Sequence, residues 1–316
     1  MNKIILKNKD LARLDQNAAA VYLTSMNSKV GRVSMRQALN VCAGLLSGNA
    51  DAASFAWHEL RFQHVTAIRT RLNEKYKPAS VNKMLAAVRG VLKAAWQLGQ
   101  MSAEDYYKAA SVKGVKNDTL PAGRELTQGE ITALMSACEH DTTNAGARDA
   151  AIVGLMYSCG LRREEVVTLD LADYESESGR LVVRGKGNKE RIAWLTGGAA
   201  RAVADWLAVR GEDTGALFVA VNKSGRMASQ KNMTPKTIYN MLAKRATEAG
   251  VKSFSPHDMR RTFVSDLLDA GADITTVSKM AGHSSVTTTS RYDRRPEEAK
   301  RKAASLLHVP YAGRGA

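Results

Sequence analysis

The chain has few cysteines and no long apolar run. Its 316 residues include three cysteines, Cys42, Cys138 and Cys159. Three scattered thiols exclude a disulfide framework and fit a reducing compartment. No stretch approaches the roughly 18 apolar residues that cross a bilayer. The apolar run that follows Met1 is also too short for a secretory signal. We therefore expect a cytoplasmic protein that does not use a membrane as a partner.

Metal-binding patterns are also scarce. The six histidines are too dispersed for a zinc site that is local in sequence. No Asp/His cluster has the two-metal character of a metal nuclease or phosphodiesterase. We expect neither a metal nor another cofactor.

Acidic residues are scarce in the first part of the chain. The net charge is +15, and residues 1–120 contain 18 Lys+Arg against 8 Asp+Glu, which gives +10 of it. The length predicts two domains at roughly 100–200 residues each. A small basic domain before a larger, nearly balanced one indicates a module that binds a polyanion, attached to a unit with another task. Charge alone does not separate DNA from RNA or an acidic membrane surface, and a basic excess also serves solubility.

Residues 1–112 are predicted to form an all-helical domain. Apolar residues recur at spacings of three and four from Val81 to Trp96, after the start signals Pro78 and Ser80. Gly90 lies inside this stripe and would let another helix approach closely. The polar side of the helix either binds phosphate or is a solvated basic face. Its candidate DNA contacts are Lys83, Arg89 and Lys93.

Residues 113–124 are polar, basic and interrupted by Gly and Pro, which is typical of an interdomain linker. Lys113 and Lys116 are candidate DNA contacts there. A capping box at Thr127 and Glu130 then opens a helix, so the second domain is predicted over 125–316. Two β-prone runs flank the turn 185–189 and predict a hairpin among helices. The predicted helices include 148–159, 161–169, 235–248, 256–269 and a tail helix over 296–307. The fold class is therefore mainly α with a small β component.

Four segments of the second domain carry residue types suited to one reaction. Gly160 ends a helix, so Arg162 lies in the first turn of the next, where an anion is favoured. Lys186 lies between two glycines in the hairpin turn. His257 and Arg260 are three residues apart on one helix face. His283 follows Gly282, and Tyr292 comes nine residues later.

In this order, Gly-Leu-Arg-x-x-Glu, Gly-Lys-Gly-x-Lys-x-Arg, His-x-x-Arg, Gly-His and the tyrosine resemble the tyrosine recombinase (phage integrase) family, above all the Xer-type recombinases. The match covers residues 125–295. Relatives often carry leucines where this chain has Met280-Ala281, a difference that concerns packing. The resemblance implies a helical core-binding domain and a mixed α+β catalytic domain. It also implies a site-specific recombinase that cleaves and rejoins DNA without a metal.

The residue types agree with this chemistry. Breaking a phosphodiester without a metal requires neutralised phosphate oxygens, an in-line nucleophile and an acid for the leaving oxygen. Arginine binds phosphate oxygens in a bidentate manner, so Arg162 and Arg260 are the natural clamp. Tyr292 is the candidate nucleophile, able to remain bound to phosphorus.

The resemblance implies the remaining roles. The product would be a 3′-phosphotyrosyl link with a free 5′-hydroxyl, and Lys186 would be the general acid for the 5′-oxygen. His257 would act as acid or base toward the tyrosine proton or donate to the phosphate, and His283 would donate a further hydrogen bond. Independently of the resemblance, Glu165 lies three residues from Arg162 on the same helical face, so it is expected to hold a catalytic side chain in place. Lys189 and Arg191 are candidate contacts to the DNA backbone.

The resemblance also implies partners. These are double-stranded DNA with a specific recombination site and a homotetramer on two such sites that exchanges strands through a Holliday junction. A related recombinase could be part of it. The two domains would clamp the duplex, and the tail from Arg295 would dock on a neighbouring subunit. Two alternatives stay open: a type IB topoisomerase that relaxes DNA without a target site, and a non-catalytic DNA-binding protein on the same fold.

Overall fold

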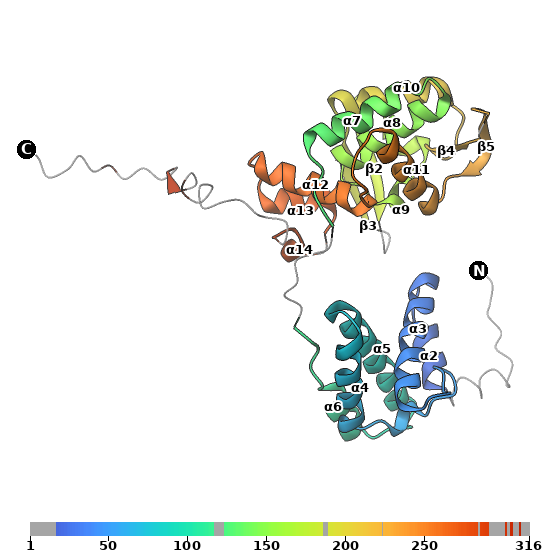
Figure 1. Cartoon of the computed structure of the whole chain (residues 1–316), viewed down its shortest axis with the longest axis vertical. Helices are drawn as coiled ribbons and strands as arrows, with labels where there is room; N and C mark the ends of the chain where they lie inside the picture. The colour runs from blue at the N-terminus through green and yellow to red at the C-terminus, as the bar shows by residue number, and fades with distance from the viewer. Residues whose placement is uncertain are drawn as a thin grey trace, which may run out of the picture. The chain divides into compact units, whose positions relative to one another are not determined.

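The computed structural model describes residues 17–116, 123–185, 189–222, 224–283 and 285–290, with the single residues 301, 304, 305 and 310. The chain divides into two compact units, Met1–Leu120 and Pro121–Ala316 (Figure 1). Within the described part, no helix is long and apolar enough to cross a membrane.

The described part of the first unit consists of helices around one core. Helix α5 contributes the largest set of buried residues, on the face that the apolar stripe predicts. The elements are α2 (Ala18–Thr24), α3 (Lys29–Leu46), the 3-10 helix η1 (Trp57–Glu59), α4 (Phe62–Lys75), α5 (Pro78–Gln97) and α6 (Ala103–Ala110).

Gly90 allows a close approach between α2 and α5. A Cβ atom at this position would lie 2.2 Å from Cε2 of Tyr22, which belongs to α2. Only a residue without a side chain leaves room for the tyrosine ring, so the prediction for Gly90 is confirmed.

The second unit combines helices with two small antiparallel sheets. One sheet has the order β1-β2-β3 and the other pairs β4 with β5. The predicted hairpin is the β2–β3 pair, in register from Arg180↔Trp194 to Gly185↔Lys189. The elements are α7 (Gln128–Glu139), α8 (Asn144–Ser158), α9 (Arg163–Val166), η2 (Leu171–Asp173), β1 (Tyr174–Glu175), β2 (Arg180–Gly185), β3 (Lys189–Trp194), α10 (Gly197–Arg210), β4 (Val219–Val221), β5 (Met227–Asn232), α11 (Pro235–Glu248), α12 (Pro256–Asp269), α13 (Ile274–Ala281) and α14 (Val286–Ser290).

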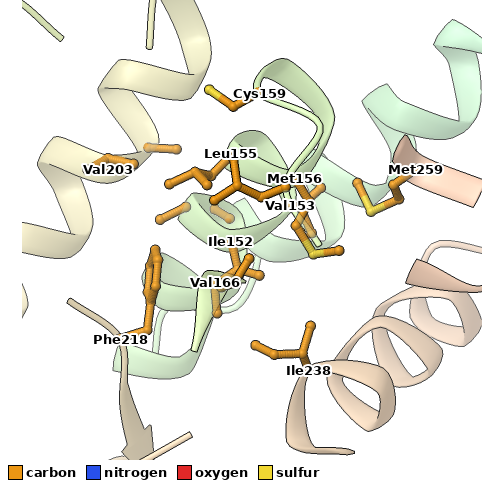
Figure 2. Close-up of a cluster of buried hydrophobic side chains, with 14 of the residues drawn as sticks. Ile152, Val153, Leu155, Met156, Cys159, Val166, Val203, Phe218, Ile238 and Met259 are labelled. Atoms are coloured by element: carbon orange, nitrogen blue, oxygen red, sulfur yellow. The ribbon is translucent and has the colours of Figure 1, made fainter. Parts of the chain in front are cut away.

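Helix α8 is the centre of the second core. Its residues 150–156 are all buried, and side chains from α9, α10, α11 and α12 surround it (Figure 2). Cys159, which ends this helix, is 3% exposed and lies in the same cluster. Burial raises the pKa of its thiol. This cysteine is therefore part of the core, and α8 is a rigid support for the segment that follows it.

The helix predicted over 161–169 is shorter in the structure and ends at Val166. The chain then turns away because its backbone pairs with another segment. The Leu217 N–H donates to the carbonyl oxygen of Leu169 at 2.8 Å, and the Leu171 N–H donates to that of Gly215 at 2.9 Å. These bonds replace the next helical turn. By contrast, α11 and α12 have the predicted bounds, and the fold class is confirmed. Of the predicted tail helix over 296–307, only residues 301, 304 and 305 are among the described residues, so this prediction stays untested.

The first described residues of the second unit form hydrogen bonds to side chains of α12. The Arg124 N–H donates to Oδ1 of Asp258 at 3.0 Å, and the Leu126 N–H donates to the hydroxyl of Thr262 at 2.9 Å. Asp258 also accepts from Ser255 and thereby caps α12. The helix that carries His257 and Arg260 is thus fixed at its N-terminal end.

Candidate active site

A glycine turn places Arg162 at the start of α9. Gly160 has a φ of +58°, and a Cβ there would lie 2.3 Å from the ring of Phe263 on α12. Both the backbone conformation and the close ring require glycine. Arg162 is then the N-cap of α9, and its side chain is 40% exposed.

Glu165 binds Arg162 twice. Its Oε2 accepts from the Arg162 backbone N–H at 2.9 Å, and its Oε1 accepts from Nη1 of the same residue at 2.7 Å. The carboxylate is 4% exposed. Burial acts to raise the pKa of Glu165, but hydrogen bonds from Arg191 and Arg162 outweigh it and lower that pKa. A buried carboxylate that stays ionised can hold a guanidinium group in place, which is the supporting role predicted for Glu165.

The C-terminal end of α13 lies beside α9 and α12 in this site. Arg260 is 2% exposed and donates to the carbonyl oxygens of Gly160 (2.6 Å) and Ala281. Nη2 of Arg162 donates to the carbonyl oxygen of Gly282 at 3.3 Å. Gly282 is left-handed, with φ +62°, and it ends α13 directly before His283. The two predicted clamp arginines therefore meet at this turn.

His257 and His283 lie in the positive field of these arginines. Nδ1 of His283 is 2.8 Å from the hydroxyl of Thr289. Burial, followed by the charges of Arg260 and Arg162, lowers the pKa of His283 to about 4. Partial desolvation and Arg260 also lower the pKa of His257, although its side chain reaches solvent. The positive surroundings therefore favour the neutral form of both imidazoles, in which each ring keeps one N–H donor.

A pocket of about 310 Å³ opens at this cluster. The lining residues come from α9, α11 and α12: Arg162, Arg163, Glu164, Tyr239, Ser255, Pro256, His257 and Arg260. Its basic lining and size suit a phosphate group in an extended polyanion. Among the described residues, no group of three or more His, Cys, Asp or Glu side chains could hold a metal ion.

The structure thus brings together Arg162, Glu165, His257, Arg260 and His283. Lys186 and Tyr292 lie outside the described residues. The roles of all seven residues stay predictions at this point.

The predicted DNA contacts differ in their surroundings. Five of them have exposed side chains: Lys83, Lys93, Lys113, Lys116 and Lys189. Nη2 of Arg89 instead donates to the carbonyl oxygen of Val112 at 2.5 Å, within the first unit.

Arg191 is a further part of the site that its predicted role did not include. Its guanidinium donates to Glu165 through Nη1 at 3.1 Å and Nη2 at 2.8 Å, and to the carbonyl oxygen of Met280 through Nε at 3.0 Å. The side chain is 12% exposed. The sequence signal was the presence of an acidic residue on the Arg162 helix with a second arginine in the hairpin, but no spacing rule joins two residues 26 positions apart.

Residues 124–298, which include this entire cluster, match the description "Phage integrase family". The chain belongs to that family. It is 32% identical to the tyrosine recombinase XerC of Pelobacter propionicus over 223 residues, 70% of each chain. It is 29% identical to the tyrosine recombinase XerD of Pseudomonas putida over 306 residues, 96% of this chain and 97% of that protein. The resemblance to the Xer-type tyrosine recombinases is therefore confirmed. This recombinase is an enzyme that cleaves and rejoins DNA.

Solved structures show the same fold. The Tn1549 transposon integrase in complex with transposon right end DNA gives a TM-score of 0.67 at 17% identity, covering 93% of this recombinase and 99% of that chain. The XerH site-specific recombinase bound to a palindromic difH substrate gives 0.65 at 17% identity, covering 94% and 96%. The match extends over both units of the recombinase.

Proposed function

We propose that this recombinase cleaves double-stranded DNA at a specific site through attack of Tyr292 on the scissile phosphate. The phenolic oxygen bonds to phosphorus, the bond from phosphorus to the 5′-oxygen breaks, and a 3′-phosphotyrosyl link holds the strand. The reverse attack by a 5′-hydroxyl rejoins it. The observation that carries this proposal is the meeting of Arg162, His257 and Arg260 at one basic pocket, with His283 adjacent.

The charge of the pocket supports phosphoryl chemistry. Two guanidinium groups balance the negative charge that grows on the non-bridging oxygens. His257 accepts the phenolic proton of Tyr292, and His283 donates to the phosphate. Lys186 supplies the proton that the departing 5′-oxygen needs. These assignments of His257, His283 and Lys186 follow the family resemblance.

Assembly on DNA forms part of the same proposal. We propose a homotetramer on two recombination sites, exchanging strands through a Holliday junction, with a related recombinase as a second possible subunit. Residues 1–112 form the core-binding domain, 113–124 the linker and 125–316 the catalytic domain with its tail. The basic first domain supplies much of the affinity, so binding weakens steeply as salt rises.

The test uses a nicked recombination site, identified by sequencing DNA recovered from covalent complexes. We expect a complex that survives denaturant, forms in EDTA and is lost in Tyr292→Phe, while DNA binding remains. Tyr239→Phe is the matched control, because Tyr239 lines the pocket. A complex that persists in Tyr292→Phe but disappears in Tyr239→Phe refutes the nucleophile assignment. Relaxation of supercoiled DNA without a target site would instead support a topoisomerase.

A further inference from the structure

Arg191 faces inward at the active site. It lies on β3, and its guanidinium donates twice to Glu165 and once to the main chain of α13. A side chain that contacts the DNA backbone would instead be directed at solvent, as Lys189 is. These contacts favour a role for this arginine within the site.

The carboxylate of Glu165 is shared between two guanidinium groups. It accepts from Nη1 of Arg162 at 2.7 Å and from both terminal nitrogens of Arg191. A buried carboxylate needs close partners to offset its desolvation. Without Arg191, Glu165 would depend on Arg162 alone and would draw that guanidinium away from an incoming phosphate. Arg191 therefore leaves Arg162 available to the substrate.

The other end of Arg191 holds the turn that precedes His283. Its Nε donates to the carbonyl oxygen of Met280 at 3.0 Å. A Cβ at Gly282 would lie 3.2 Å from Cδ and from Nη1 of Arg191, so the turn packs directly on this side chain. One residue thus connects the segment of Arg162 with the segment of His283.

We propose that Arg191 is a positioning residue for strand transfer: by sharing Glu165 with Arg162 and by holding the end of α13, it keeps Arg162 and His283 aligned on the scissile phosphate. This inference rests on the proposed function, which places that phosphate in the pocket. It replaces the interpretation of Arg191 as a contact to the DNA backbone.

The test compares Arg191→Met with the unmodified recombinase on two nicked substrates. One carries the ordinary scissile phosphate, and the other a neutral methylphosphonate. On phosphate we expect cleavage to be about 100-fold slower, the scale of a misplaced catalytic group. On the methylphosphonate the difference should shrink to about 10-fold or less, because less charge must be balanced by Arg162. DNA affinity should change little.

Three further variants make the result specific. Arg191→Lys keeps a positive charge opposite Glu165 but cannot make the forked contact. Its cleavage rate on phosphate should therefore fall less than that of Arg191→Met, and the defect should again be smaller on the methylphosphonate. The double variant Glu165→Gln/Arg191→Met should lose less transition-state stabilisation than the sum of the losses measured in the two single variants. Arg210→Met is the control, because Arg210 holds main-chain carbonyl oxygens of the 211–216 loop, and its cleavage should remain normal.

An equal loss on both substrates, or a loss of DNA binding that accounts for the slower cleavage, would overturn the inference. Its failure is separable from failure of the proposed function. Arg191→Met should still form the Tyr292 complex at long times. A covalent complex that survives Tyr292→Phe rejects the nucleophile, whatever Arg191 does.

Discussion

Arg162 donates to the carbonyl oxygen of Gly282 at 3.3 Å, although 120 residues separate them in sequence. The two preceding carbonyl oxygens, of Met280 and Ala281, accept from Arg191 and Arg260. The end of α13 therefore binds three arginines from three different segments. The C-terminal end of a helix carries partial negative charge, which favours cations there. This turn fixes the relative positions of the groups proposed to bind the phosphate.

Replacing Gly282 with alanine should impair both stability and cleavage. The left-handed backbone costs about 1 kcal/mol for a residue with a side chain. The new methyl group would also press on Arg191, whose nearest atoms lie 3.2 Å from the ideal Cβ position. We expect cleavage of a nicked site to slow by about 10-fold or more as the arginine moves.

Gly250→Ala separates the two effects. Gly250 follows α11 with φ +65°, and an ideal Cβ there meets nothing within 4 Å. Gly250→Ala should lower the free energy of unfolding in urea by about as much as Gly282→Ala does, but its cleavage rate should stay normal. If both variants cleave equally slowly, backbone strain and not the contact with Arg191 accounts for the loss.

The depressed pKa of His283 predicts a pH-dependent stability. The folded protein holds the pKa of this imidazole at about 4, below its ordinary value of 6.5. Between these values the unfolded chain binds more protons at this residue. The free energy of unfolding should therefore fall as the pH drops from about 6.5 to 4, and His283 should add no further slope below that range.

Urea unfolding at several pH values, without DNA, checks this prediction. His283→Gln should flatten the slope within the window. His140→Gln is the control, since His140 is an exposed histidine at the end of α7. An unchanged slope in His283→Gln would mean that other groups cause the acid sensitivity.

Local sequence signals predicted a large part of this fold. The bounds of α11 and α12 could be predicted because each begins with a cap residue followed by proline, Thr234-Pro235 and Ser255-Pro256. The β2–β3 hairpin could also be predicted, because its two strands are neighbours in sequence. The end of α9 could not be predicted from local signals, since it depends on backbone pairing with Leu217 and Gly215, about 50 residues further along.

The site shows the same division. The order of the motifs, through the family resemblance, pointed to Arg162, His257, Arg260 and His283, and the structure brings these four residues together. The contacts of Arg191 could not be predicted from the sequence alone. A basic residue in a Gly- and Lys-rich turn looks like a DNA contact until the fold brings the buried Glu165 carboxylate beside it.

Asp258 should contribute more stability than an ordinary helix cap. It is 5% exposed, caps α12 through Ser255 and accepts from the Arg124 backbone. Loss of the cap costs about 1 kcal/mol, and the loss of the part-buried hydrogen bond from the Arg124 N–H adds about 1 kcal/mol. Asp258→Ala should therefore lower the free energy of unfolding by the sum of both.

Asp273→Ala provides the comparison in the same unit. Asp273 caps α13 through Thr275 and Thr276, which belong to its own helix. Its replacement should cost only the cap term. Urea unfolding of both variants measures the difference. Equal losses would show that the bond between Arg124 and Asp258 adds nothing to stability.

The basic residues of α5 should separate into two classes. Lys83 and Lys93 have exposed side chains, whereas Arg89 donates to the carbonyl oxygen of Val112. If each lysine binds one phosphate, Lys83→Ala and Lys93→Ala should each reduce the slope of log affinity against log salt by about 0.9. Arg89→Ala should mainly lower the stability of the first unit.

Titrations of a recombination site at several salt concentrations measure the slopes, and thermal unfolding measures the stability. A lysine variant with an unchanged slope does not contact phosphate, and an Arg89 variant with a reduced slope and normal stability would place that guanidinium on the DNA.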